Sequence, residues 1–271
     1  MYSSSSLSKR LILVPILAVM AIQLLFIRSV SSLNMTNAYL NHTCIESQGQ
    51  YKPGSAFENN LKSIIISIAT TSNNVAGYDT MSLIGSPEDT VSAIFQCRGD
   101  SYGPKCRDCY ATALAGLRRR CPRYKGGVIW YDQCLLEISA VDSVGKIVYD
   151  NSFCMSNAQN VSDGEIKFDE IKSLVDNLTS LVITEKNNSN PTALYAAGEK
   201  TFGKEKLYGM VQCTKDLSPE ACQECLGSKI LRFQNCLFGK RGARVVGRSC
   251  NFRFEFYPFV TTKEGRNYLK S

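Results

Sequence analysis

The chain has 271 residues, a formal net charge of +7 at pH 7, twelve cysteines and one histidine. Removing Lys9, Arg10 and Arg28 with an N-terminal leader lowers the charge by three to +4, too small an excess to indicate nucleic-acid binding. The sequence has no GxSxG motif and no phosphate-binding glycine loop, so we expect a protein that is not an enzyme and that needs no cofactor.

The N-terminus has the features of a cleaved signal peptide. A basic pair precedes an apolar run from Leu11 to Ile27, and Val30 and Ser32 stand at the small-residue positions that signal peptidase reads. We expect residues 1–32 to be removed and the mature chain to be secreted. An uncleaved signal anchor is the alternative, because a run of about 17 apolar residues approaches the length of a membrane span. No second run of that length follows, so we expect no membrane span after cleavage.

The first half of the mature chain predicts two helices and several strands. Residues 55–71 place Phe57, Leu61 and Ile68 on one helical face. Residues 90–97 and 126–141 are rich in β-branched and aromatic residues, which is typical of strands. Between them, Cys106, Cys109, Tyr110, Ala113, Leu114 and Leu117 follow helical spacing.

The second half repeats this order of elements. Residues 168–182 predict a helix, and residues 194–213 predict a hairpin around Gly203. Ser218 is a plausible N-cap for a helix whose apolar face includes two cysteines three residues apart. Residues 251–259 alternate apolar and polar side chains, as a strand with one buried face does. We therefore expect an α+β fold of two modules, each an antiparallel sheet of about five strands with two helices on one face.

The cysteines form an internal repeat. The gaps between them are 52, 8, 2, 11 and 12 residues in the first half and 58, 8, 2, 10 and 13 in the second. The boundary falls between Ser143 and Phe153. We expect a first domain at residues 33–143, a linker at 144–153, a second domain at 154–262 and a C-terminal tail at 263–271.

Six cysteines per module in an oxidising compartment indicate three disulfides per module. A zinc site is the weaker alternative, because neither module has a second Cys-x2-Cys pair and His42 is the only histidine. A thioredoxin-like role for one Cys-x2-Cys pair is the other alternative. We expect no metal.

Five sequons agree with passage through the secretory pathway: Asn34, Asn41, Asn160, Asn177 and Asn187.

The motif Cys-x8-Cys-x2-Cys, present at Cys97–Cys109 and again at Cys213–Cys225, resembles the plant cysteine-rich repeat secretory proteins. That family is built from two ginkbilobin-homologous (salt stress response/antifungal) domains, and the resemblance covers essentially the whole mature chain. Relatives carry the same pair of domains as ectodomains of receptor-like kinases and of plasmodesmata-located membrane proteins. The absence of a second apolar run favours the soluble branch, located in the plant apoplast and linked to stress or defence.

The resemblance also implies a disulfide pairing, which cysteine spacing alone leaves open among fifteen arrangements. In the family the first cysteine pairs with the fifth, the second with the third and the fourth with the sixth. The implied pairs are Cys44–Cys121, Cys97–Cys106, Cys109–Cys134, Cys154–Cys236, Cys213–Cys222 and Cys225–Cys250.

A carbohydrate site is implied in the second module only. Ginkbilobin binds mannose through an Asn just after the first cysteine, an Arg six residues before the last cysteine and a Glu five residues after it. The second module has Arg244 and Glu255 at two of these places and Met155 in place of the Asn. An ordinary solvated ion pair is the alternative for the two charged residues. The first module has Ile45, Val128 and Ser139 at the three places.

Two residues 11 positions apart face opposite sides of a flat strand, so a shared site for Arg244 and Glu255 requires a bulge or turn between them. Gly247 in the sequence VGRSC marks the expected place.

Two smaller signals have structural interpretations. The RGD tripeptide at Arg98–Asp100 is read as coincidence, because it lies in a constrained segment. Trp130 is expected in the core rather than against a sugar ring.

The sequence thus predicts a secreted, non-enzymatic recognition protein whose two modules pack against each other. Mannose-type carbohydrate binding through the second module is one hypothesis. The alternative is a protein-interaction module that docks to receptor-like or other cell-surface ectodomains without binding sugar. The sequence leaves the oligomeric state open.

Overall fold

A computed structural model describes residues 37–71, 78–83, 86, 89–160, 168–184, 194–202, 205–260 and 268–270. Leu40–Ser271 forms one compact unit that includes both cysteine-rich modules, and Met1–Tyr39 belongs to a separate unit. The predicted signal peptide and the sequons at Asn34 and Asn187 lie outside the described residues. In the described part of the chain, no helix combines the length and apolar character needed to cross a membrane.

The first module contains a five-stranded sheet with the strand order β1-β4-β5-β3-β2. The neighbours β2 and β3, β3 and β5, and β4 and β5 pair antiparallel. Two helices, α2 and α3, pack on this sheet. The elements are β1 (Tyr39–Cys44), η1 (Glu46–Gln48), α2 (Ala56–Thr71), β2 (Tyr78–Leu83), β3 (Val91–Cys97), α3 (Pro104–Arg120), β4 (Gly127–Tyr131) and β5 (Cys134–Ser139).

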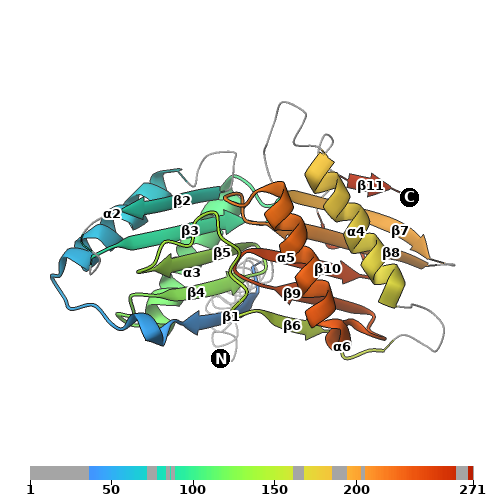
Figure 1. Cartoon of the computed structure of the whole chain (residues 1–271), viewed down its shortest axis with the longest axis horizontal. Helices are drawn as coiled ribbons and strands as arrows, with labels where there is room; N and C mark the ends of the chain where they lie inside the picture. Colours follow the sequence, from blue (N-terminus) through green and yellow to red (C-terminus); the bar gives the residue numbers. More distant parts are fainter. Residues whose placement is uncertain are drawn as a thin grey trace, which may run out of the picture. The chain divides into compact units, whose positions relative to one another are not determined.

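The second module contains a six-stranded sheet with the order β11-β7-β8-β10-β9-β6. The helices α4 and α5 cross the same face of this sheet (Figure 1). The elements are β6 (Phe153–Ser156), α4 (Phe168–Thr184), β7 (Tyr195–Phe202), β8 (Glu205–Cys213), α5 (Pro219–Arg232), α6 (Gln234–Leu237), β9 (Gly242–Val246), β10 (Cys250–Glu255) and β11 (Tyr268–Lys270). The predicted α+β fold with two antiparallel sheets is confirmed.

Two details differ from the expected elements. The last residues of the chain, expected as a tail, include β11, which pairs with β7 in parallel and adds a sixth strand. The apolar stretch 126–141 is not one strand, because the chain turns at Asp132 and Gln133 between β4 and β5. That turn brings a carboxylate to the end of the hairpin, where it becomes the centre of the site described below.

The cysteine-bearing helices form for local reasons that the sequence makes visible. Ser218 caps α5 by accepting a hydrogen bond from the Ala221 amide at 3.1 Å, and Pro219 occupies the first helical position. Cys222, Cys225 and their apolar neighbours at helical spacing are buried against the sheet. In α3 the equivalent stripe is also buried, including both cysteines, except for Leu114, which is half-buried.

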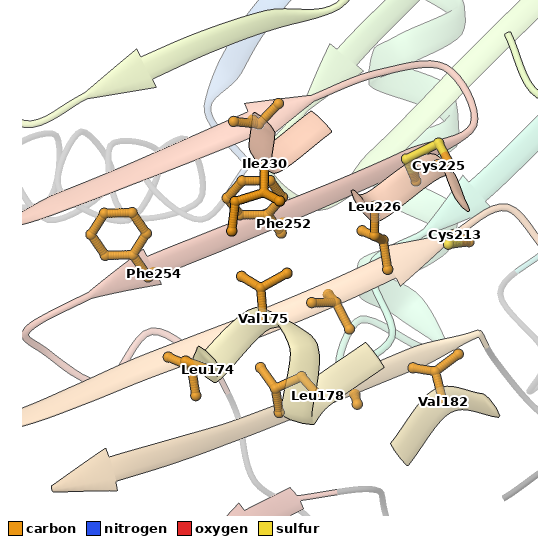
Figure 2. Close-up of a cluster of buried hydrophobic side chains, with 14 of the residues drawn as sticks. Leu174, Val175, Leu178, Val182, Cys213, Cys225, Leu226, Ile230, Phe252 and Phe254 are labelled. Carbon is orange, nitrogen blue, oxygen red and sulfur yellow. A yellow bond between two sulfur atoms is a disulfide. The ribbon is translucent and has the colours of Figure 1, made fainter. Parts of the chain in front are cut away.

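Each module has its own hydrophobic core between helices and sheet. In the second module, Leu174 and Leu178 of α4 and Ile230 of α5 pack against Phe252 and Phe254 of β10 (Figure 2). The two phenylalanines alternate with outward-facing polar residues, so β10 presents one apolar face to the helices and one polar face away from them. The polar face carries the candidate site.

Six disulfides hold the two modules, and they join the pairs that the family resemblance implies. The described residues include no free cysteine. In each module, the two cysteines of the cysteine-bearing helix reach different strands, one before the helix and one after it. The bond between Cys44 and Cys121 closes a loop of 77 residues, for which the chain-entropy model gives about 4 kcal/mol of stabilisation.

Lys229 of α5 is a buried charge in the second module. Its side chain is 1% exposed, and its Nζ donates a hydrogen bond to Ser152 Oγ. Gly247 makes room for it, because a Cβ at that position would lie 2.9 Å from Lys229 Cε. Burial and then the charge of Arg232 lower the pKa of Lys229 to about 8, and the charge of Asp150 opposes them.

This pKa makes stability depend on pH in a predictable direction. Below about pH 8 Lys229 is charged in the folded and unfolded chain, so the full cost of burying the charge is present. From there to about 10.5 the folded chain loses the proton first, and stability rises. Lys229→Met should abolish this rise and increase the free energy of unfolding at pH 7 by about 1–3 kcal/mol. Urea denaturation between pH 6 and 10 measures it. Lys62→Met, at an exposed site, is the control, and an unchanged pH profile in Lys229→Met would refute the assignment.

Candidate functional site

The three residues of the implied carbohydrate site lie on one face of the second sheet. The chain turns between β9 and β10, so Arg244 and Glu255 are on neighbouring strands rather than on one unbroken strand. Arg244 lies opposite Arg253 in the β9–β10 pairing and opposite Met155 in the β6–β9 pairing. Glu255 is two residues from Arg253 and therefore on the same face. The expected turn at Gly247 is present.

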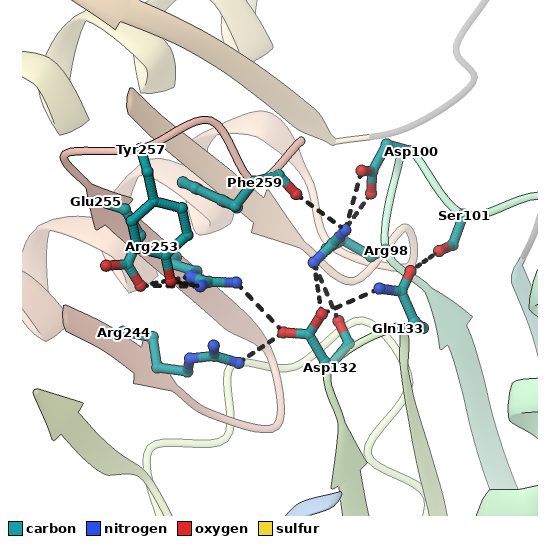
Figure 3. A network of polar contacts seen from close by, with 10 residues as sticks. All are labelled: Arg98, Asp100, Ser101, Asp132, Gln133, Arg244, Arg253, Glu255, Tyr257 and Phe259. Carbon is teal, nitrogen blue, oxygen red and sulfur yellow. Dashed lines mark hydrogen bonds and ion pairs between the residues drawn. The ribbon is translucent and has the colours of Figure 1, made fainter. Parts of the chain in front are cut away.

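The charged side chains of this face already have partners within the chain. Arg244 Nη1 binds Asp132 Oδ1 at 2.7 Å, across to the first module, as Figure 3 shows. Glu255 is 6% exposed, its Oε1 accepts a hydrogen bond from Arg253 Nε at 2.9 Å, and the same oxygen forms an ion pair with Arg253 Nη2 at 2.9 Å. Arg244 is thus not a solvated partner of Glu255. Met155, at the place of the family's Asn, is 43% exposed and offers no amide to a ligand.

Asp132 is the centre of an ion cluster that joins the modules. Its Oδ1 accepts from Arg244 and, at 3.4 Å, from Arg253 Nη1. Its Oδ2 accepts at 2.9 Å from Arg98 Nη1 and at 3.0 Å from the Gln133 amide. One carboxylate of the first module therefore serves two arginines of the second and one of its own (Figure 3).

The electrostatics follow from this geometry. Burial raises the pKa of Asp132, but the charges of Arg98, Arg244 and Arg253 outweigh it, and the net pKa is below its usual value. Burial, followed by the charge of Arg253, lowers the pKa of Arg244 against the opposing effect of Asp132. Burial also acts to lower the pKa of Arg98, but its bond to Asp100 and the nearby carboxylates raise it overall. The cluster holds its ionised state because each charge has a partner.

The RGD tripeptide belongs to the same interface. Arg98 Nε binds Asp100 Oδ1 at 2.6 Å, and the Asp100 side chain is 2% exposed. Gly99 lies so close to Tyr195 of the second module that a Cβ there would be 2.2 Å from the Tyr195 Cγ. The tripeptide is therefore a structural element of the module interface, with Asp100 buried and Arg98 and Gly99 half-buried.

Trp130 is core, as expected, but at the junction of the modules. Its ring packs edge-on against Phe153 at 5.3 Å between centroids, and its Nε1 donates to the Gly247 carbonyl at 3.0 Å. It is 2% exposed, with Val128, Leu135 and Val246 around it. A sugar ring therefore has no access to this indole.

A small cavity lies beside the ion cluster. Its volume is about 60 Å³, and Arg98, Asp132, Arg244 and Arg253 are among its lining residues. Small-molecule sites typically have roughly 300–1,000 Å³. A polar cavity of this size holds a few water molecules instead.

The other predicted residues lie elsewhere. Asn160 and Asn177 are exposed, as a glycosylation site requires, and Asn41 is half-buried in β1. Among the described residues, His42 with Cys44 and Cys121 is the group whose ligand atoms gather within 4.8 Å. These cysteines form a disulfide and offer no thiolate, so this group is not a metal site.

Sequence reasoning singled out Arg244 and Glu255 but missed Asp132 and Arg253. A signal for both was available. When the modules are aligned at their last cysteine, Asp132 corresponds to Arg248, and Glu137 corresponds to Arg253. Opposite charges at two matched positions are what two surfaces need in order to contact each other with complementary charge.

Removing the central charge should destabilise the pair of modules. Asp132→Asn keeps the shape but leaves three largely buried arginines without their shared counter-charge, and breaking a buried pair costs about 3–5 kcal/mol. Because the Asp132 pKa is lowered, its stabilisation is present above the unfolded value near pH 4 and disappears as pH falls through the folded value. Chemical denaturation from pH 2.5 to 7 tests both statements. Asp176→Asn, at an exposed pair with Lys172, should cost below about 0.5 kcal/mol; equal effects of the two changes would contradict the account.

The close contact at Gly99 gives a second test. Gly99→Ala should lower the melting temperature, because the new methyl group collides with the Tyr195 ring. Gly227 of α5 has nothing within 4 Å of an added Cβ. Gly227→Ala should therefore be neutral or stabilise by about 0.5–1 kcal/mol through helix propensity. Calorimetry compares the two; a harmless Gly99→Ala would exclude the contact.

Comparison with known proteins agrees with this architecture. The salt stress response/antifungal family model matches residues 43–141 and again 153–257. Putative cysteine-rich repeat secretory protein 17 of Arabidopsis thaliana is 62% identical over all of both chains, and cysteine-rich repeat secretory protein 18 of the same plant is 49% identical over all of both chains.

Two solved structures share the fold. The tandem DUF26 ectodomain of the Arabidopsis thaliana cysteine-rich receptor-like protein PDLP8 has a TM-score of 0.69 at 20% identity, with 82% of this chain and 99% of that chain covered. The tandem DUF26 ectodomain of PDLP5 from the same plant has a TM-score of 0.60 at 23% identity, with 80% of this chain and 98% of that chain covered. The sequence matches and the doubled disulfide-linked module together show that this chain belongs to the family of cysteine-rich repeat secretory proteins with two salt stress response/antifungal domains.

Proposed function

We propose that this chain is a non-enzymatic recognition protein of the plant apoplast that docks to the ectodomain of another protein, and that its second module does not bind mannose-type glycans. The observation that carries the proposal is the 2.7 Å ion pair between Arg244 and Asp132. It commits to the module interface an arginine that a sugar site would need, and Glu255 is held by Arg253. The resemblance to the salt stress response/antifungal family supports a role in stress or defence.

A groove beside the linker supports protein docking. It has a volume of about 470 Å³ and is lined by residues of the first module, by residues 146–150 and by Arg248. Val141 and Tyr149, also in its lining, are large apolar side chains that are 60% and 39% exposed. Exposed apolar groups with a polar rim are typical of protein-interaction surfaces. The tandem ectodomains of receptor-like proteins that share this fold are reasonable first partners to try.

The experiment sets the two hypotheses against each other. Purified chain is passed over immobilised tandem ectodomains of receptor-like proteins and, separately, over a glycan array that includes mannosides. We expect binding to at least one ectodomain, at least a tenfold loss with Val141→Asp, and no mannoside signal. Ile66→Asp is the matched control, because Ile66 is 64% exposed on α2 and is absent from the lining of the groove. Mannoside binding that Arg244→Ala abolishes, together with silence on all ectodomains, would overturn the proposal.

A further inference from the structure

The contacts between the two modules are reciprocal at equivalent positions. Gln96 and Gln212 each precede the second cysteine of their module. The Gln96 amide donates to the Cys213 carbonyl at 2.8 Å, and the Gln212 amide donates to the Cys97 carbonyl at 2.9 Å. Such an exchange of identical contacts is the property of a two-fold interface between like subunits. The two modules therefore meet as the halves of a homodimer would.

Two ion pairs follow the same symmetry, but with their signs exchanged. Two residues before the last cysteine stand Asp132 and Arg248, and three residues after it stand Glu137 and Arg253. Asp132 Oδ1 lies 3.4 Å from Arg253 Nη1, and Glu137 Oε2 accepts from Arg248 Nε at 2.7 Å. The first module supplies the acid in both pairs, and the second module supplies the arginine in both.

These four side chains are largely buried. Glu137 and Arg248 are 2% and 10% exposed, and Asp132 and Arg253 are 18% and 11% exposed. Charges at such sites are poorly screened, so like charges brought together there repel strongly. Two first modules in this arrangement would set Asp132 against Glu137. Two second modules would set Arg248 against Arg253.

We propose that these four residues determine which modules can pair. The interface surface of each module binds only a module that carries the opposite charges at the matched positions. That partner module belongs to the same chain or to a second copy of the chain. The occupant that fits the first module is a second module, and pairing of like modules is excluded. The reciprocal glutamine bonds do not discriminate, because they are the same in either combination. The ion pairs supply the repulsive element that discrimination needs.

This role differs from that of a simple stabilising contact. Buried ion pairs add little net stability compared with apolar groups of similar size, and their best-attested role is to fix which partners meet. The pair of Glu137 and Arg248 is suited to a test, because within the described part of the chain its carboxylate accepts one further hydrogen bond, from Ser143. Trp130, the single tryptophan of the chain, is buried at the interface and reports its opening.

The test uses the full chain with Glu137→Arg, with Arg248→Glu and with both changes. Each single change places like charges together, so we expect a lower denaturant midpoint and a red shift of Trp130 emission. The double variant restores opposite charges with the order reversed, and we expect it to recover at least half of the lost midpoint. When the two single variants are mixed, the first module of the Glu137→Arg chain can pair with the second module of the Arg248→Glu chain. The unchanged Glu137 and Arg248 of the other two modules can pair as well. Sedimentation should then detect a one-to-one dimer that neither variant forms alone.

The exposed pair of Lys172 and Asp176 on α4 is the control, because the same exchange there should produce no measurable coupling. If the single variants fail to fold, recovery of a folded chain by the double variant still supports the proposal. A double variant no more stable than the sum of the single effects overturns it. A mixture without dimer overturns it as well.

Discussion

The packing of the two modules against each other depends on one carboxylate that is shared by three arginines. Asp132 lies at the turn between β4 and β5 and neutralises Arg244 and Arg253 of the other module together with Arg98 of its own. Because the cluster is largely buried, salt screens it weakly. The modules are therefore held as one unit, and Arg244 and Arg253 on the polar face of the second sheet bind across the interface to Asp132. In this arrangement Arg98 and Arg244 are both committed to the interface, where the Asp100 side chain and Trp130 are also buried.

Disulfides and charges have separate tasks in this architecture. The six disulfides fix each module internally, since every one of them joins cysteines of the same module. They leave the residues between cysteines free to vary, which is why the two copies of the cysteine motif share spacing and little else. The two modules carry opposite charges at two matched positions, Asp132 with Arg248 and Glu137 with Arg253. Cross-linking thus sets the fold of each module, and electrostatics set how the modules combine.

Much of the fold was predictable because its signals are local. The cap at Ser218, the apolar stripe of α4 and the alternation along β10 each depend on neighbours within a few residues. The turn at Gly247 was predictable for the same reason. The disulfide pairing was not, since spacing allowed fifteen arrangements and only the family resemblance chose one.

The site was less predictable because its partners are far apart in sequence. Arg244 and Asp132 are 112 residues apart, and nothing near either residue indicates the other. Reasoning from one module assigned Arg244 to Glu255, whereas the packing of two modules assigns it to Asp132. The sign reversal between the copies at Asp132 and Arg248 was the available clue, and it is meaningful only when the two modules are compared as potential partners.

The central claim is that the charged interface makes the two modules one rigid body. Backbone ¹⁵N relaxation measured separately for β3–β5 and for β8–β10 tests it most directly. The account predicts the same rotational correlation time for both modules, in low salt and in high salt, at the value expected for the whole chain. Two shorter and unequal correlation times, each typical of a single module, would contradict it.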